Sequence, residues 1–197
     1  MPKIFSSSDH HFYHKNIIKY AERPFDFNDP NCVADNAKLM IERHNEIVSS
    51  EDIHIFVGDL SASLRGRQEH FKSLLKLMNG RKILVRGNHD HEPDQFYLDA
   101  GFIDVVNYIY IPPFFINHYP CSFSKYSKGP ELQMSFNMRG KHIETIIHGH
   151  IHNKDPSKWN TDSYKRINMC VDFEPNNYYP QELTQPEIVE YFNSKYK

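Results

Sequence analysis

The sequence predicts a mixed α/β fold with parallel strands in its first half. Short apolar runs typical of buried strands alternate there with segments whose apolar residues recur at helical spacing. Several of these runs end abruptly on polar side chains that could bind a metal, as residues 82–85 do before Gly87-Asn88-His89-Asp90. The chain has 197 residues, which is enough for a substantial core. We therefore expect one domain over residues 1–197.

The first half of the chain accounts for the parallel sheet. Strands are expected at 3–7, 53–57 and 82–86, and helices at 14–21, 33–48 and 71–78. Pro24 should end the first helix, because proline disfavours helix in the residue before it. Gly80 is well placed to end the third helix. Strands and helices thus alternate, as they do in parallel sheets.

In the second half the strands become consecutive. A short helix is expected at 94–100, then one or two strands within 102–111, and further strands at 114–118, 144–147 and 167–173. Thr184 and Glu187 form a capping-box pattern before a final helix over 188–192. Residues 119–142 have little pattern, and we expect a loop insert there, lying over the site.

Composition excludes several classes of function. The formal net charge is −2, so no strong binding to nucleic acid is indicated. Three scattered cysteines argue against a disulfide scaffold and for a reducing compartment. We find neither a signal peptide nor an 18-residue apolar span, so we expect a soluble cytoplasmic protein with no membrane partner. The oligomeric state stays open.

Histidine is the compositional outlier, with 13 in the chain. Surface placement could explain His44, His70 and His142, but not those that cluster after apolar runs. Asp9 and His11 are two apart, as are His150 and His152, so in extended backbone each pair would point the same way.

Three further residues complete the candidate ligand set. Gly58 before Asp59 lets an ion approach closely. Asn88 offers a neutral oxygen, and His118 another imidazole. This mixed set exceeds one tetrahedral zinc site and suits two adjacent divalent ions of the Mn, Fe, Zn or Ni type. Such pairs of ions, about 3.5–4 Å apart, activate water and clamp phosphoryl groups.

The order and spacing of these motifs resemble the calcineurin-like metallophosphoesterase superfamily, and in particular its small stand-alone members. The series is Asp9-x-His11, Gly58-Asp59, Gly87-Asn88-His89-Asp90, His118 and Gly149-His150-x-His152. The resemblance implies two stacked mixed β-sheets flanked by helices, a four-layer αββα sandwich with its site at the strand ends. It also implies the ligand sets: Asp9, His11 and His152 for the first ion, Asn88, His118 and His150 for the second, and Asp59 bridging the two.

The same resemblance implies roles in a reaction. A hydroxide shared by the two ions would attack phosphorus. His89 would stay free of metal and either hydrogen-bond a phosphate oxygen or protonate the leaving group. His14 and Arg23 are candidate substrate-binding residues, and a place in the first turn of its helix is the alternative for His14. Arg86 and Asp90 could brace the site.

The function expected from the sequence is a metal-dependent phosphoesterase. Its partner would be a small phosphorylated substrate, a phosphodiester or a nucleotide. One alternative is a phosphomonoesterase acting on a small metabolite. Another is a non-catalytic metal-binding scaffold, which the intact set of seven ligands and His89 disfavours. A mononuclear zinc hydrolase lacks its HExxH signature here.

Overall fold

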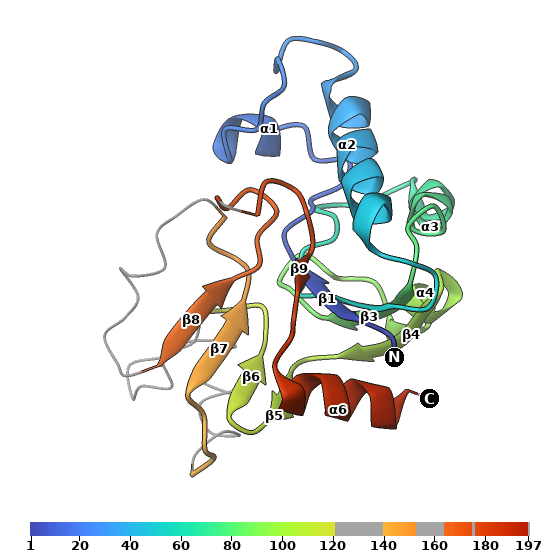
Figure 1. The fold of residues 1–197 in the computed structure, drawn as a ribbon. Coiled ribbons are helices and arrows are strands. Elements are labelled where there is room, and N and C mark those ends of the chain that lie inside the picture. Colours follow the sequence, from blue (N-terminus) through green and yellow to red (C-terminus); the bar gives the residue numbers. More distant parts are fainter. Residues whose placement is uncertain (121–139, 153–163, 175, 197) are drawn as a thin grey trace.

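Two β-sheets stacked face to face form the centre of the molecule (Figure 1). The structure is a computed structural model that describes residues 1–120, 140–152, 164–174 and 176–196. Within these residues the first sheet has the strand order β4-β3-β2-β1-β9 and the second β5-β6-β7-β8. The first sheet contains β1 (Ile4–Ser7), β2 (Ile53–Phe56), β3 (Arg81–Val85), β4 (Phe102–Val106) and β9 (Gln181–Glu182). The second contains β5 (Ile109–Ile111), β6 (Phe114–Ile116), β7 (Thr145–His148) and β8 (Lys165–Asn168).

Both sheets are mixed but largely parallel. Strands β1 to β4 pair in parallel, and the short β9 pairs antiparallel with β1. In the second sheet β5 pairs antiparallel with β6, while β6, β7 and β8 are parallel. Parallel strands deliver their carboxyl ends to the same edge of a sheet, so the loops that follow them gather at one end of the molecule.

The two-residue alternation of strands divides the core into layers. In β2, Ile53 and Ile55 face the second sheet, and Phe56 packs on the helical side. In β6, Ile116 faces the first sheet, and Phe115 packs in a separate cluster on the outer face. One side of each strand therefore fills the space between the sheets.

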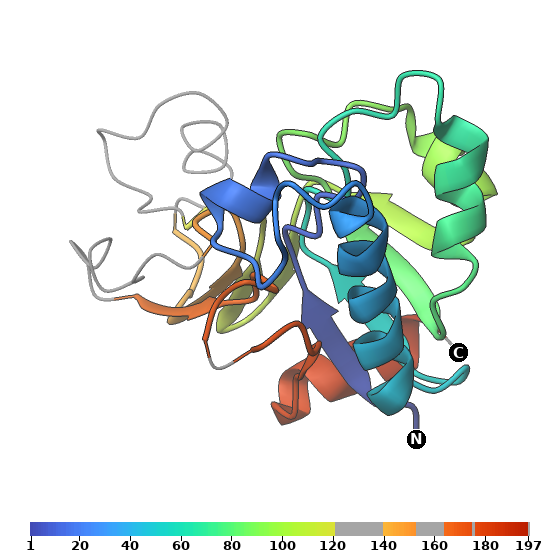
Figure 2. The same cartoon turned by 90° about the horizontal axis from the view of Figure 1, so that it is seen from above.

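Helices cover the outer face of the first sheet. These are α2 (Cys32–Ile47), α3 (Gln68–Leu75) and α4 (Asp94–Asp99), which contribute Met40, Phe71 and Tyr97 to the outer cluster. Figure 2 shows α2 and α3 on the side away from the second sheet. The short α1 (Ile17–Tyr20) packs in its own small cluster, and α6 (Pro186–Lys195) inserts residues between the sheets. The described residues place no helix over the outer face of the second sheet.

The two sheets are joined where β1 ends. Ser8 forms a parallel bridge with Cys170: its amide donates to the Met169 carbonyl, and its carbonyl accepts from the Val171 amide. This link brings the carboxyl ends of β1, β7 and β8 together at the edge where the predicted ligands lie.

The predicted α/β class, with two mixed sheets flanked by helices, is confirmed. Three local predictions were wrong. Thr184 forms no capping box, because α6 begins at Pro186 with Gln185 as N-cap and no side-chain cap bond. Strand β8 spans Lys165–Asn168 rather than 167–173. His44, expected at the surface, is buried.

Two other expectations can be compared with the described residues only. The loop insert at 119–142 falls mostly in 121–139, outside the described residues. No helix in the part of the chain that the structure describes has the length and apolarity needed to cross a bilayer.

Candidate metal centre

Loops after five strands meet at the carboxyl edge of the two sheets. Asp9 follows β1, Asp59 follows β2, and Asn88 follows β3. His118 follows β6, and the segment with His150 and His152 follows β7. Residues 141 positions apart touch there, since the His150 amide donates to Asp9 Oδ2 at 2.9 Å. The structure therefore brings the predicted ligands together.

The backbone at these residues differs from the extended geometry that their spacing suggested. Positive φ angles occur at Asp9 (59°), His11 (48°), Asp59 (56°), His150 (75°) and His152 (53°). L-residues other than glycine rarely adopt this left-handed region, and such conformations concentrate at functional sites. Each ligand pair thus meets through tight left-handed turns, and not through the alternation of an extended strand.

The first ligand group consists of Asp9, His11 and His152. Asp9 Oδ1 lies 3.9 Å from His11 Nε2 and 3.8 Å from His152 Nε2. The Asp9 side chain is fully buried, and the His11 and His152 rings stack with centroids 5.1 Å apart. Three potential ligand atoms therefore converge on one point.

The second group consists of Asp59, His118 and His150, and Asn88 lies beside it. His118 Nε2 lies 3.4 Å from Asp59 Oδ2, 3.2 Å from His150 Nδ1 and 3.2 Å from Asn88 Oδ1. His118 is fully buried, whereas His150 and Asn88 are exposed. The group therefore has a buried floor and an open side.

Asp59 lies between the two groups. Its Oδ2 is 3.6 Å from His11 Nε2 in the first group and 3.4 Å from His118 Nε2 in the second. A single carboxylate thus has both clusters within reach, which is the position of a ligand shared by two ions.

One curated relative is similar over most of the chain. It is the uncharacterized protein MJ1445 of Methanocaldococcus jannaschii, 33% identical over 183 residues that cover 93% of this chain and 88% of MJ1445. The chain belongs to the MJ1445 family. No family model matches the sequence.

One solved structure shares the fold of this MJ1445-family chain. A protein of unknown function from Aquifex aeolicus, AQ665, superposes with a TM-score of 0.66 at 23% identity, over 97% of this chain and 100% of that one. A more distant similarity is to the phosphopantetheinyl hydrolase PptH of Mycobacterium tuberculosis, with a TM-score of 0.47 and 11% identity over 93% of this chain and 96% of that one.

The donor atoms of the two ligand groups fit divalent cations. Asp9 Oδ1 and His11 Nε2 are buried, and neither has a hydrogen-bond partner in the described part of the chain. His118 Nδ1 donates to the Val57 carbonyl at 2.9 Å, and in the neutral ring this leaves the Nε2 lone pair facing the Asn88 oxygen. Two acceptors face each other there, so a proton or a cation has to lie between them.

The electrostatics of the site also favour bound cations. Burial lowers the pKa of His118, but the carboxylates of Asp59 and Asp9 outweigh burial and raise that pKa to about 9. Burial raises the pKa of Asp9, but the imidazoles of His118, His152 and His11 lower it below its usual range. The carboxylates are therefore held in their ionised form, which is the form that binds a divalent ion, and such an ion would take the place of the His118 proton.

Asp172 is a supporting residue that the sequence analysis missed. Its Oδ2 accepts from His152 Nδ1 at 2.7 Å, which directs His152 Nε2 toward Asp9. A carboxylate behind a histidine in this way fixes the tautomer and orientation that a metal ligand needs. Asp172 directly follows Val171, so it was a carboxylate at the end of an apolar run, hidden inside the strand predicted over 167–173.

Arg23 is placed behind the site, away from the substrate side. Its side chain is fully buried and pairs with both Asp172 oxygens, at 2.6 and 3.1 Å, and its guanidinium also donates to the backbone carbonyls of Asp9 and His10. We therefore correct the predicted substrate-binding role of Arg23. A guanidinium with these partners braces the Asp9 loop and Asp172, and has no free surface for a substrate.

Asp90 acts as a second brace, in agreement with the sequence-based suggestion. Its carboxylate accepts the backbone amides of Asp59, Leu60 and Gly87 at 2.8–3.0 Å. It thereby ties the loop after β2 to the loop after β3. Gly87 is needed at this junction, because a Cβ there would lie 2.2 Å from Asp59 Oδ1.

His89 and His14 lie at the open side of the site. His89 is held by its amide, which donates to Asp59 Oδ1 at 2.9 Å, and its Nε2 lies 4.0 Å from Asp59 Oδ2. Its side chain is 40% exposed. His14 is partly buried, with its ring 5.7 Å from that of His11. Both histidines are thus close enough to contact a molecule bound at the two ligand groups.

Proposed function

We propose that this protein is a dinuclear metal-dependent phosphoesterase of the calcineurin-like type. The observation that carries the proposal is the position of Asp59 Oδ2, within 3.6 Å of one ligand group and 3.4 Å of the other. A shared carboxylate between two such groups is typical of centres that hold two ions.

In this proposal the chain holds one ion with Asp9, His11 and His152, and the other with Asn88, His118 and His150. Asp59 serves both. Two divalent ions of the Mn, Fe, Zn or Ni type would supply Lewis-acid activation of water and of the phosphoryl group. The protein supplies fixed donors and the ionised carboxylates that retain the ions.

His89 is the proposed catalytic residue that does not bind metal. Its backbone is anchored to Asp59, and its ring is free to approach a substrate. It hydrogen-bonds a phosphate oxygen or gives a proton to the leaving oxygen. His14, next to His11, is proposed to contact the phosphoryl group. Arg23 and Asp172 act behind the site by positioning Asp9 and His152.

The proposed substrate is a small phosphodiester or nucleotide, with a small phosphomonoester as the alternative. Cys32 and Cys170, the cysteines among the described residues, are buried free thiols that fit a reducing compartment, and we propose the cytoplasm as the location. A non-catalytic metal scaffold is the second candidate function, and it would bind the ions without turnover.

Purified protein loaded with Mn²⁺ should hydrolyse bis(4-nitrophenyl) phosphate, 4-nitrophenyl phosphate, or both. Loss of a general acid typically costs 10²- to 10⁴-fold, so His89→Asn should lower kcat by at least about a hundredfold on the matching phenyl esters, whose phenolate needs a proton to leave, while metal content stays at the wild-type level. His142→Asn is the matched control, because His142 is exposed and pairs with Glu144 on the surface. If the protein binds metal but hydrolyses neither ester, the non-catalytic scaffold is favoured. Full activity of His89→Asn would refute the role of His89 as the general acid.

A further inference from the structure

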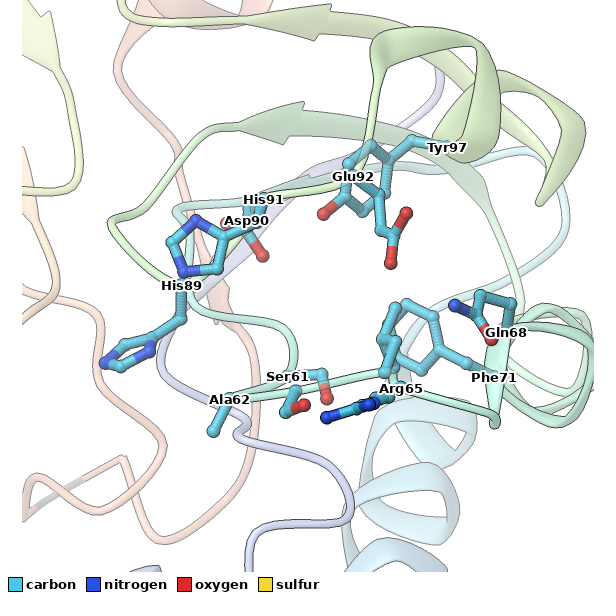
Figure 3. A pocket seen from close by; sticks show the side chains of 12 residues that line it. Ser61, Ala62, Arg65, Gln68, Phe71, His89, Asp90, His91, Glu92 and Tyr97 are labelled. Carbon is cyan, nitrogen blue, oxygen red and sulfur yellow. The ribbon is translucent and has the colours of Figure 1, made fainter.

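A pocket adjoins the candidate metal centre on the far side of His89 (Figure 3). It is lined by two loops, one after Asp59 and one after His89, and by residues of α3 and α4, and its volume is about 270 Å³. Figure 3 shows His89 at one end of the hollow, with its ring turned outward, and Gln68 and Phe71 at the other end. The same outward turn brings His89 Nε2 to 4.0 Å from Asp59 Oδ2. His89 therefore stands between the pocket and the metal ligands.

The pocket carries two opposite charges that are not paired with any other side chain among the described residues. Arg65 and Glu92 lie on opposite sides of the hollow (Figure 3). Among the described residues, neither the Arg65 guanidinium nor the Glu92 carboxylate has a hydrogen bond or an ion pair. The nearby Arg86 differs, because it pairs with Asp94 and donates to two backbone carbonyls. Arg65 and Glu92 are thus available to a ligand.

Position and size indicate which part of a substrate would enter. A phosphoryl group at the two ligand groups would have its leaving oxygen near His89, and the atoms beyond that oxygen would extend past His89 into the pocket. A volume of about 270 Å³ corresponds to about nine water molecules. That is below the usual range for drug-sized ligands and suits one small polar group.

We propose that this pocket binds the leaving group of the substrate. The leaving group would be a small alcohol or phenol with an anionic or hydrogen-bond-accepting group for Arg65. It would also carry a cationic or hydrogen-bond-donating group for Glu92. This inference rests on the proposed phosphoesterase function and makes Arg65 and Glu92 its specificity-determining residues. Both contacts are made in the ground state as well as in the transition state, so they act mainly on KM.

The test uses three aryl phosphates with 4-carboxyphenyl, phenyl and 4-(aminomethyl)phenyl leaving groups, each as a monoester and as a methyl diester. The enzyme is the full chain with Mn²⁺. Arg65→Gln should lower kcat/KM for the carboxyphenyl ester about five- to tenfold more than for the phenyl ester. Glu92→Gln should lower kcat/KM for the aminomethylphenyl ester by a similar factor relative to the phenyl ester. Each variant should therefore impair a different charged ester.

Matched controls exist on the same stretch of chain. Arg67→Gln and Glu69→Gln remove like charges from exposed residues that do not line the pocket, and they should leave the ratios between the esters unchanged. If turnover is intact and the ratios of kcat/KM between the esters are the same in Arg65→Gln, Glu92→Gln and the controls, the pocket assignment is overturned. The proposed phosphoesterase function would then still hold. Absence of turnover of every ester by metal-loaded wild type would overturn both.

Discussion

The support of His152 by Asp172 makes a sharp prediction about metal affinity. Asp172 accepts three hydrogen bonds: two from Arg23, at 2.6 and 3.1 Å, and one from His152 Nδ1 at 2.7 Å. Asp172→Asn keeps the shape of the side chain but replaces one acceptor with an NH₂ group. If that group faces Arg23, two donors oppose each other. If it faces His152, the imidazole becomes the acceptor and its proton moves to Nε2, the atom needed for the ion.

The expected loss of metal affinity follows from the role of Asp172 as the partner of a ligand. Loss of a group that supports a metal ligand typically costs 10- to 100-fold in affinity, which is about 1.4–2.7 kcal/mol. Only the group containing Asp9, His11 and His152 depends on Asp172, so one of two Mn²⁺ ions should be affected. The Asp59, His118 and His150 group should bind as in the wild type.

Isothermal titration of metal-free protein with Mn²⁺ measures both sites. Asp35→Asn is the matched control, since Asp35 is exposed in the first turn of α2 and lies outside the site. Breaking a buried ion pair can cost about 3–5 kcal/mol of stability, so circular dichroism and urea unfolding must show that the variant is folded. Two unchanged dissociation constants in folded Asp172→Asn would refute the assigned role of Asp172.

Three further predictions concern the same edge of the sheets and the core beneath it. Gly149→Ala should abolish binding at the first ligand group while the fold persists by circular dichroism, because its Cβ would lie 2.4 Å from Asp9 Oδ2; wild-type Mn²⁺ stoichiometry would contradict this. Asp90→Asn should lower the free energy of unfolding, measured in urea, by about 2–4 kcal/mol, because its carboxylate accepts hydrogen bonds from three buried amides. A decrease below about 1 kcal/mol would contradict the bracing role of Asp90. Burial lowers the pKa of His44 to about 4, so between about pH 6.5 and pH 4 the unfolded chain binds a proton that the folded chain does not, and stability decreases as the pH is lowered. His44→Gln should therefore reduce the loss of stability between pH 7 and pH 5 by about 1.8 kcal/mol in metal-free urea titrations. An unchanged loss would contradict a buried neutral imidazole.

Much of the candidate site could be predicted because its ligands follow a simple rule. Asp9, Asp59 and Asn88 each come shortly after an apolar run that forms a parallel strand. The alternation of strands and helices places these ends at one edge, whatever the details of packing. Periodicity therefore predicted the convergence of the ligands without any knowledge of distances.

The sequence could not predict the backbone that orients those ligands. Two-residue spacing suggested an extended chain, but Asp9, His11, His150 and His152 adopt positive φ. Such angles cost energy for L-residues, and they persist only where tertiary contacts compensate. Here the contacts include the amide of His150 on Asp9 and the guanidinium of Arg23 on the Asp9 carbonyl. These partners are far apart in the sequence, so no local pattern reveals them.

The histidines show why composition alone does not separate ligands from core residues. His54 is as buried as His118, yet it lies within β2, with its ring 4.0 Å from that of Phe56 and its Nε2 2.8 Å from Ser7 Oγ. His118 lies two residues beyond the end of β6, where its Nε2 can reach Asp59. A histidine inside a strand is held by its neighbours in the sheet, whereas one just past the carboxyl end projects into the space where strands from both sheets converge. The position of each histidine relative to its strand, more than the number of histidines, therefore decides which of them can take part in chemistry.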